Sequence, residues 1–105
     1  MSYTILSLAS GQLPDTTAAI FTATAPTIVK DITLVNTDSA ERTVNLYLKR
    51  ASSTIRSIIP FDLILGVHYK LDTADESFTL STGDSIHGDS DVALKVDYTI
   101  SGTYK

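Results

Sequence analysis

The chain has 105 residues, a formal net charge of −4 from 8 basic and 12 acidic side chains, and no cysteine. This length fits one domain, and the missing cysteines exclude a disulfide framework and a thiolate metal site. The acidic balance argues against nucleic acid as a partner, and no apolar stretch reaches the about 20 residues that span a membrane.

The N-terminal segment, residues 1–14, alternates weakly between apolar and polar side chains and ends in a loop. It lacks the basic stretch and following apolar run of a secretory signal. We interpret it as an arm or a first edge strand that precedes a single β-sandwich domain at residues 15–105.

Two strands are predicted in the first half of the chain, because alternation with a period of two indicates a strand with one buried face. Residues 27–36 place Ile28, Lys30, Ile32 and Leu34 on one face, and both faces are partly apolar. Residues 42–50 turn Val44, Leu46 and Leu48 toward a core and Tyr47 outward. The polar residues 36–41 predict a turn, so we expect an antiparallel hairpin.

Residues 58–67 hold seven apolar side chains in ten residues without clean alternation. Pro60 cannot donate to a strand ladder, so it marks an edge, a bulge or a strand switch. At a corner between sheets some of these side chains would be exposed, and exposed apolar patches mark partner sites. A fully buried crossing strand is the alternative. The interface candidates here are Ile58, Ile59, Phe61, Leu63, Ile64 and Leu65.

Three tyrosines, Tyr3, Tyr47 and Tyr69, complete the interface candidates, because tyrosine combines a large contact area with a polar tip. A carbohydrate-binding face, the alternative, is usually built on aromatic platforms, and the chain has no tryptophan. We therefore favour a protein interface at these positions over a sugar platform.

The clearest strand is predicted near the C-terminus. Alternation there buries Val92, Leu94, Val96, Tyr98 and Ile100 before Gly102 ends the strand. Further strands are expected at residues 3–8, 18–25, 55–59, 67–72, 78–80 and 85–87. About seven to nine short strands predict an all-β antiparallel sandwich, jelly-roll-like or immunoglobulin-like, without significant helix.

The inventory of reactive side chains predicts that the protein is not an enzyme. His68 and His87 have no metal-ligand spacing, so we expect ordinary surface or edge histidines. The best ligand cluster is Asp84, Asp89 and Asp91 with Ser85 and Ser90. Its spacing is not that of an EF-hand calcium loop, and two tight turns around a short strand explain it better. We expect no catalytic residue, metal or cofactor.

Three successive stretches resemble the small β-sandwich virion proteins of tailed bacteriophages, such as capsid decoration (cement) proteins and head-fibre or tail-associated domains. They are IVKDITLVNTDSAERTVNLYLKR, SIIPFDLIL and LSTGDSIHGDSDVALKVDYTISG, and the resemblance spans roughly residues 20–102. It rests on a hairpin, an apolar-proline element and Gly-Asp turns in order. The stretch FDLILGVHY departs from the family, where a more polar loop is expected.

The resemblance implies a symmetric oligomer, commonly a homotrimer, that sits on the outside of the phage head and clamps neighbouring major capsid proteins. The expected location is therefore the virion, assembled in the host cytoplasm. Charged residues make up 19% of the chain, below the about 25% of an average domain, as expected for a surface that partners cover; a surface rich in serine and threonine is the alternative explanation. The alternative function is a tail-fibre, baseplate or adhesin module that binds host carbohydrate or protein.

Overall fold

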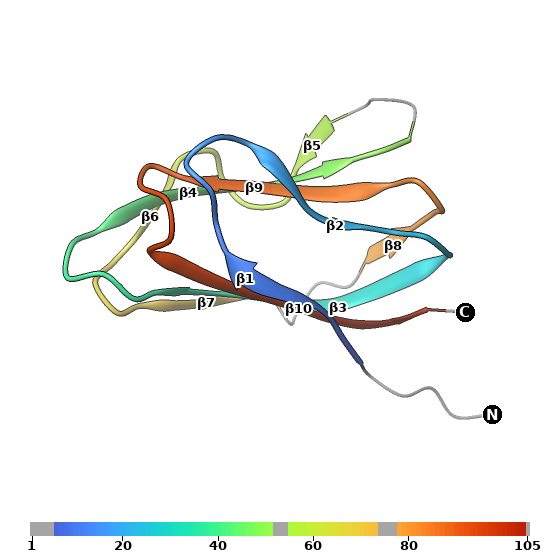
Figure 1. Ribbon diagram of the computed structural model, residues 1–105, viewed down its shortest axis with the longest axis horizontal. Helices are drawn as coiled ribbons and strands as arrows, with labels where there is room; N and C mark the ends of the chain where they lie inside the picture. The colour runs from blue at the N-terminus through green and yellow to red at the C-terminus, as the bar shows by residue number, and fades with distance from the viewer. Residues whose placement is uncertain (1–5, 52–54, 74–77, 105) are drawn as a thin grey trace.

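The computed structural model describes residues 6–51, 55–73 and 78–104. Within these ranges the chain forms ten β-strands and no helix, so the predicted all-β fold is confirmed. The strands form two antiparallel sheets that face each other as a sandwich (Figure 1). Their bounds are β1 Leu6–Gln12, β2 Ala18–Thr22, β3 Thr27–Asn36, β4 Arg42–Lys49, β5 Ile55–Ser57, β6 Leu63–Leu65, β7 Lys70–Asp72, β8 Phe78–Leu80, β9 Ser85–Ser90 and β10 Val96–Tyr104.

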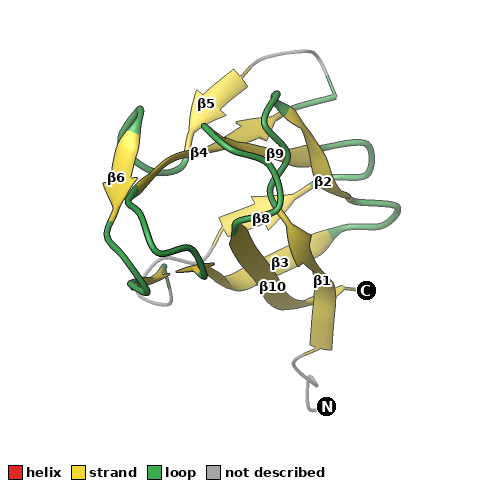
Figure 2. Cartoon of the chain, turned by 60° about the vertical axis from the view of Figure 1, so that its left-hand side comes forward, coloured by secondary structure: helices red, strands yellow, loops and turns green. Residues whose placement is uncertain are grey.

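Each sheet is four strands wide, and its last position is divided between two short strands. Sheet A has the order β1-β10-β3; β7 pairs with residues 33–35 of β3 and β8 with residues 27–29. Sheet B has the order β2-β9-β4; β5 pairs with residues 47–49 of β4 and β6 with residues 42–44. Figure 2 shows β6 set apart at one side of the sandwich.

The pairing is nested about the middle of the chain. β1 pairs with β10, β2 with β9, β3 with β7 and β8, and β4 with β5 and β6. Strands β1 to β4 also alternate between the two sheets. A long hairpin rolled up in this way is a jelly roll. Of the two sandwich types that the sequence predicts, the topology therefore selects the jelly roll.

The predicted hairpin between β3 and β4 is wrong, because β3 lies in sheet A and β4 in sheet B. The polar residues between them cross from one sheet to the other. Asn36, the last residue of β3, is fully buried and fixes this crossing. Its Oδ1 accepts a hydrogen bond from Asp38 N at 2.9 Å, and its Nδ2 donates one to Ala40 O at 2.9 Å.

The C-terminal strand begins and ends later than predicted. β10 starts at Val96, whereas Val92 and Leu94 lie in the preceding turn, where Leu94 has a positive φ of 64°. Gly102 does not end the strand, which continues to Tyr104. Val92 and Leu94 in the turn continue the apolar alternation of β10. The alternation alone therefore does not reveal at which residue strand pairing begins.

Gly102 lies where β10 passes a β-bulge in β3. The register shifts between Ser101 and Gly102 and leaves Lys30 without a pairing partner in β10. The bulge reverses the alternation of β3, so Val29 is buried while Ile28 faces outward. A Cβ atom at position 102 would lie 2.1 Å from Ile28 O, so the close approach of the two backbones requires glycine.

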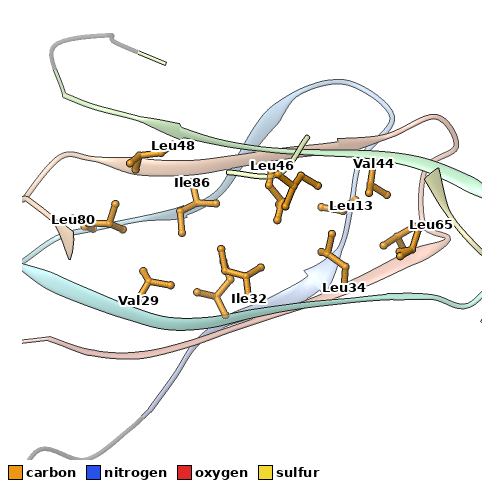
Figure 3. Packing of buried hydrophobic residues seen from close by; sticks show 14 residues of the cluster. Leu13, Val29, Ile32, Leu34, Val44, Leu46, Leu48, Leu65, Leu80 and Ile86 are labelled. Carbon is orange, nitrogen blue, oxygen red and sulfur yellow. The ribbon is translucent and has the colours of Figure 1, made fainter. Parts of the chain in front are cut away.

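A single apolar core fills the space between the sheets (Figure 3). β4 contributes Val44, Leu46 and Leu48, as its alternation predicts. Leu13, in the connection from β1 to β2, is fully buried between the two sheets. A Cβ atom on Gly88 would lie 2.9 Å from Leu13 Cδ2, so the missing side chain of Gly88 makes room for Leu13.

The remaining strands differ from prediction at their ends. Of the predicted strand at residues 3–8, residues 3–5 lie outside the described residues and the rest belongs to β1, which continues to Gln12. β9 extends to Ser90, beyond the predicted residue 87. The strands that end earlier or start later than predicted are β2, β5 and β7, and β4 ends one residue early at Lys49. Residues 67–69, predicted as strand, form a turn in which His68 has a φ of 57°.

Candidate functional site

The predicted interface segment at residues 58–67 is divided between the core and the surface. Its buried or half-buried members, all packed on the core, are Ile58, Ile59, Leu63 and Leu65. Its exposed members are Phe61, Ile64 and Val67, and Tyr69 follows them; these four are 69%, 63%, 47% and 58% exposed. We call Phe61, Ile64, Val67 and Tyr69 the apolar segment. The predicted partial exposure of the segment is therefore observed, and the alternative of a fully buried strand is wrong.

Ile64 is exposed because of the register of β6. This strand pairs with the first three residues of β4, with Ile64 opposite Thr43 and Leu65 opposite Arg42. Successive side chains of a strand point to opposite faces, so burial of Leu65 turns Ile64 to the outer face of sheet B.

The turn that carries Phe61 is held by a buried amide. Asn45 is 6% exposed, its Nδ2 donates to Asp62 Oδ1 at 3.0 Å, and its Oδ1 accepts from Asp62 N at 2.7 Å. Asp62 has a φ of 53°, a conformation in which aspartate is enriched. The Asn45 amide also donates to Asp89 Oδ1 at 3.0 Å, which ties the turn to β9. These hydrogen bonds therefore fix the turn that exposes the Phe61 side chain to solvent.

The turn that carries Val67 and Tyr69 is held by Asn36. The Asn36 Nδ2 donates to Leu65 O at 3.0 Å and to Gly66 O at 3.1 Å. The Asn36 backbone N donates to Tyr69 O at 3.0 Å, and Tyr69 N donates to Gly66 O at 3.0 Å. One buried residue thus fixes both ends of this turn and the crossing between β3 and β4.

Sequence reasoning missed these two asparagines. Asn45 lies in the middle of a strand and Asn36 at the end of one, and asparagine is depleted in strands. A polar amide at a strand position is the signal that could have found them, because a buried amide needs partners from neighbouring chain segments.

Two more exposed apolar side chains lie at the end of the sandwich where β3 crosses to β4. Val92 and Leu94, predicted as core residues, are 37% and 64% exposed, so that prediction is wrong. Their turn is bonded to the β3–β4 crossing by Thr37 N, which donates to Lys95 O at 2.9 Å. Arg42 joins the same region by ion pairs with Asp38 at 3.0 Å and Asp91 at 3.2 Å.

Tyr47, the other described tyrosine candidate, lies on the outer face of sheet B directly opposite His87. The two side chains line an open hollow of about 230 Å³ together with Thr17, Lys49 and Ile55. Burial raises the pKa of the Tyr47 phenol, and the nearby carboxylates Asp89 and Asp62 raise it further.

The surroundings of the histidine in this hollow favour its uncharged form. Burial lowers the pKa of His87 below its ordinary value, and the Lys49 ammonium adds to the effect. The His87 Nε2 lies 3.0 Å from Ser85 Oγ. In the described ranges no carboxylate holds the other ring nitrogen, so this pair lacks the third member of a hydrolytic triad.

The predicted acidic cluster is not one site. Asp84 is buried at the start of β9, where its carboxylate accepts hydrogen bonds from Ala51 N at 2.9 Å and Ser81 N at 2.9 Å, and pairs with Arg50 at 2.7 Å. Asp89 and Asp91 lie at the other end of β9. Asp89 and Ser90 belong to the strand, not to a turn. Among the described residues, no group of three histidine, aspartate or glutamate side chains could hold a metal ion.

The N-terminal candidates are only partly described. Tyr3 lies outside the described residues, as does the start of the predicted arm. Residues Leu6–Gln12 form β1, an edge strand of sheet A that pairs with β10. The described part of the chain holds no helix of the length and apolarity that crossing a membrane requires.

The similarity of this chain to known proteins is low. No protein-family model and no curated protein matches it. A search of solved structures finds a chain from the structure of infectious bursal disease virus, Gt strain, with 11% identity and a TM-score of 0.25. The match covers 97% of this chain and 38% of the viral chain, so this chain spans well under half the length of the other. A likeness of this size carries no functional argument.

Proposed function

We propose that this protein is a structural virion protein, a capsid decoration (cement) protein that oligomerises, as a homotrimer, and binds the outside of a tailed-phage head. The observation that carries the proposal is the apolar segment. Turns that the buried amides of Asn36 and Asn45 fix expose Phe61, Val67 and Tyr69, and the register of β6 exposes Ile64. Exposed apolar surface of this kind marks a contact with a partner. Turns that are already ordered lose less entropy when they dock.

The fold and the composition support a packing role. Viral capsid domains share the jelly roll with lectins and cupins, so the fold admits a virion protein without selecting it. The low charged fraction of 19% suits a surface that neighbouring subunits cover. In a cyclic oligomer the same contact recurs at every interface, and repetition turns weak contacts into a stable attachment. The assignment to a tailed phage and to its head rests on the resemblance of the sequence to the virion proteins of tailed bacteriophages.

The test is a matched pair of substitutions, Ile64→Thr and Ile55→Thr. Both isoleucines lie in three-residue strands that pair with β4, and they are 63% and 55% exposed, respectively. Threonine keeps the β-branched shape that strands favour, so both variants should fold. Ile64→Thr should weaken binding to undecorated heads and Ile55→Thr should not, as measured by co-sedimentation. Equal binding by the wild type and Ile64→Thr would count against the apolar segment as the contact.

Copy number separates this function from the adhesin alternative. Hundreds of copies per purified particle are expected for a head decoration protein, and a handful for a tail module. Heads that carry the protein should also melt at a higher temperature, because a ligand that binds only the assembled state stabilises it by mass action. Heads whose melting is unchanged at saturating protein would refute a cementing role.

A further inference from the structure

The outer face of sheet B carries a hollow whose lining residues are not members of the apolar segment. Its floor is the cross-strand pair Tyr47 and His87, and Thr17, Lys49 and Ile55 form its walls. In the described part of the chain, neither the Tyr47 hydroxyl nor the Lys49 ammonium has a hydrogen-bond partner. The hollow therefore combines apolar faces with polar groups that are available to a ligand.

The size of the hollow suits a single ring of a ligand. Its volume is about 230 Å³, and pockets for drug-sized ligands range from about 300 to 1,000 Å³. The faces of a phenol and an uncharged imidazole, with the branched side chain of Ile55, suit a ring that presents C–H groups on one face. A longer ligand would leave the hollow after this ring and continue into solvent.

The charges around the hollow favour an uncharged ligand. The carboxylates of Asp62 and Asp89 act on the Tyr47 phenol but do not line the hollow, whereas Lys49, which lines it, acts on His87. The carboxylates near the phenol disfavour an anion, and the Lys49 ammonium disfavours a cation. In the lining, the Tyr47 hydroxyl can donate and accept a hydrogen bond and the Lys49 ammonium can donate. Hydroxyl groups of a ligand can use both, because each hydroxyl donates and accepts.

A pyranose ring has these properties together: one apolar C–H face, several hydroxyl groups and no charge. An aromatic side chain of a partner protein would pack on the apolar surface of the hollow, but it would leave the Tyr47 hydroxyl and the Lys49 ammonium without hydrogen-bond partners. We propose that this protein binds one neutral pyranose unit of a saccharide in the hollow between Tyr47, His87 and Ile55. This proposal does not require the protein to sit on a phage head, because the protein should bind the sugar without any capsid present.

The experiment titrates the full chain with neutral methyl glycopyranosides of glucose, galactose and mannose and follows the amide resonances by heteronuclear NMR. At least one glycoside should bind with millimolar affinity and shift resonances on the outer face of sheet B. Tyr47→Phe keeps the ring but removes one hydroxyl contact, so binding should weaken about two- to tenfold. Tyr47→Ala removes the platform and should abolish measurable binding. Tyr69→Ala removes a more exposed tyrosine outside the hollow and should bind like the wild type.

Three results would overturn the proposal. The first is the absence of shifts with every glycoside in a wild-type protein whose spectrum shows it folded. The second is equal binding by the wild type and Tyr47→Ala, since the sugar would then bind elsewhere. The third is tighter binding of p-cresol than of any glycoside, because the hollow would then suit an aromatic side chain of a partner. If Tyr47→Ala does not fold, Lys49→Ala replaces it and should weaken binding, since it removes a donor from the rim.

Discussion

Replacement of Asn36 by alanine tests whether one buried amide holds the crossing between the sheets and the turn that carries Tyr69. The amide Nδ2 donates to the carbonyls of Ala40, Leu65 and Gly66 at 2.9, 3.0 and 3.1 Å, and Oδ1 accepts from Asp38 N at 2.9 Å. Alanine removes all of these contacts at a side chain with no exposed surface.

The expected loss of stability follows from the number of hydrogen bonds that the Asn36 side chain makes. A side-chain amide has two N–H hydrogens, so the three donated contacts count as two full bonds, and the accepted bond makes a third. At about 1 kcal/mol net per bond, the loss is about 3 kcal/mol. That is a large part of the about 5–15 kcal/mol that holds a typical domain together. The melting temperature should fall by about 12–24 °C at about 4–8 °C per kcal/mol.

Urea denaturation followed by circular dichroism would measure the free energy of unfolding of the wild type and Asn36→Ala. A loss below about 1 kcal/mol would refute the reasoning, because it would mean that water replaces the amide at no cost. Asn36→Asp adds a test by pH. Its carboxylate would face carbonyl oxygens, so its folded-state pKa should rise above the about 3.9 of an unfolded aspartate. Its deficit should therefore be small below about pH 4 and grow as the pH rises through the folded-state pKa.

Three further predictions concern other parts of the fold. Gly102→Ala should yield little folded protein, because its Cβ would lie 2.1 Å from a backbone carbonyl oxygen, whereas Gly66→Ala, with its nearest neighbour at 3.8 Å, should express normally. Backbone hydrogen bonds and an arginine lower the pKa of Asp84. Its contribution to stability is thus present above about pH 4 and lost as the pH falls through the folded-state pKa, so Asp84→Asn should flatten the acid limb of a melting-temperature profile. Burial and the neighbouring Asp72 raise the pKa of Asp31, so Asp31→Asn should melt higher than the wild type at neutral pH and equally below about pH 4; no gain at neutral pH would contradict the raised pKa.

Local patterns were enough for the class of the fold and for much of the core. Alternation in Val44, Leu46 and Leu48 predicts their burial, because one face of a half-buried strand must be apolar. Alternation failed at Val92 and Leu94, which continue the pattern of β10 into a turn. It also failed at the bulge beside Gly102, because the extra residue in β3 is set by pairing with a strand far away in the sequence.

The sequence by itself determined that this is a small all-β sandwich with a dense apolar stretch at residues 58–67, since composition and period-two alternation are local properties of the chain. Only the tertiary structure decided that the sandwich is a jelly roll, because strand order depends on pairing between distant segments such as β1 and β10. It also decided which side of the dense stretch faces water. Leu65 is buried and Ile64 exposed through the register of β6 on β4 and the hydrogen bonds of Asn36 and Asn45. The hollow at Tyr47 and His87 likewise exists only where β4 and β9 meet.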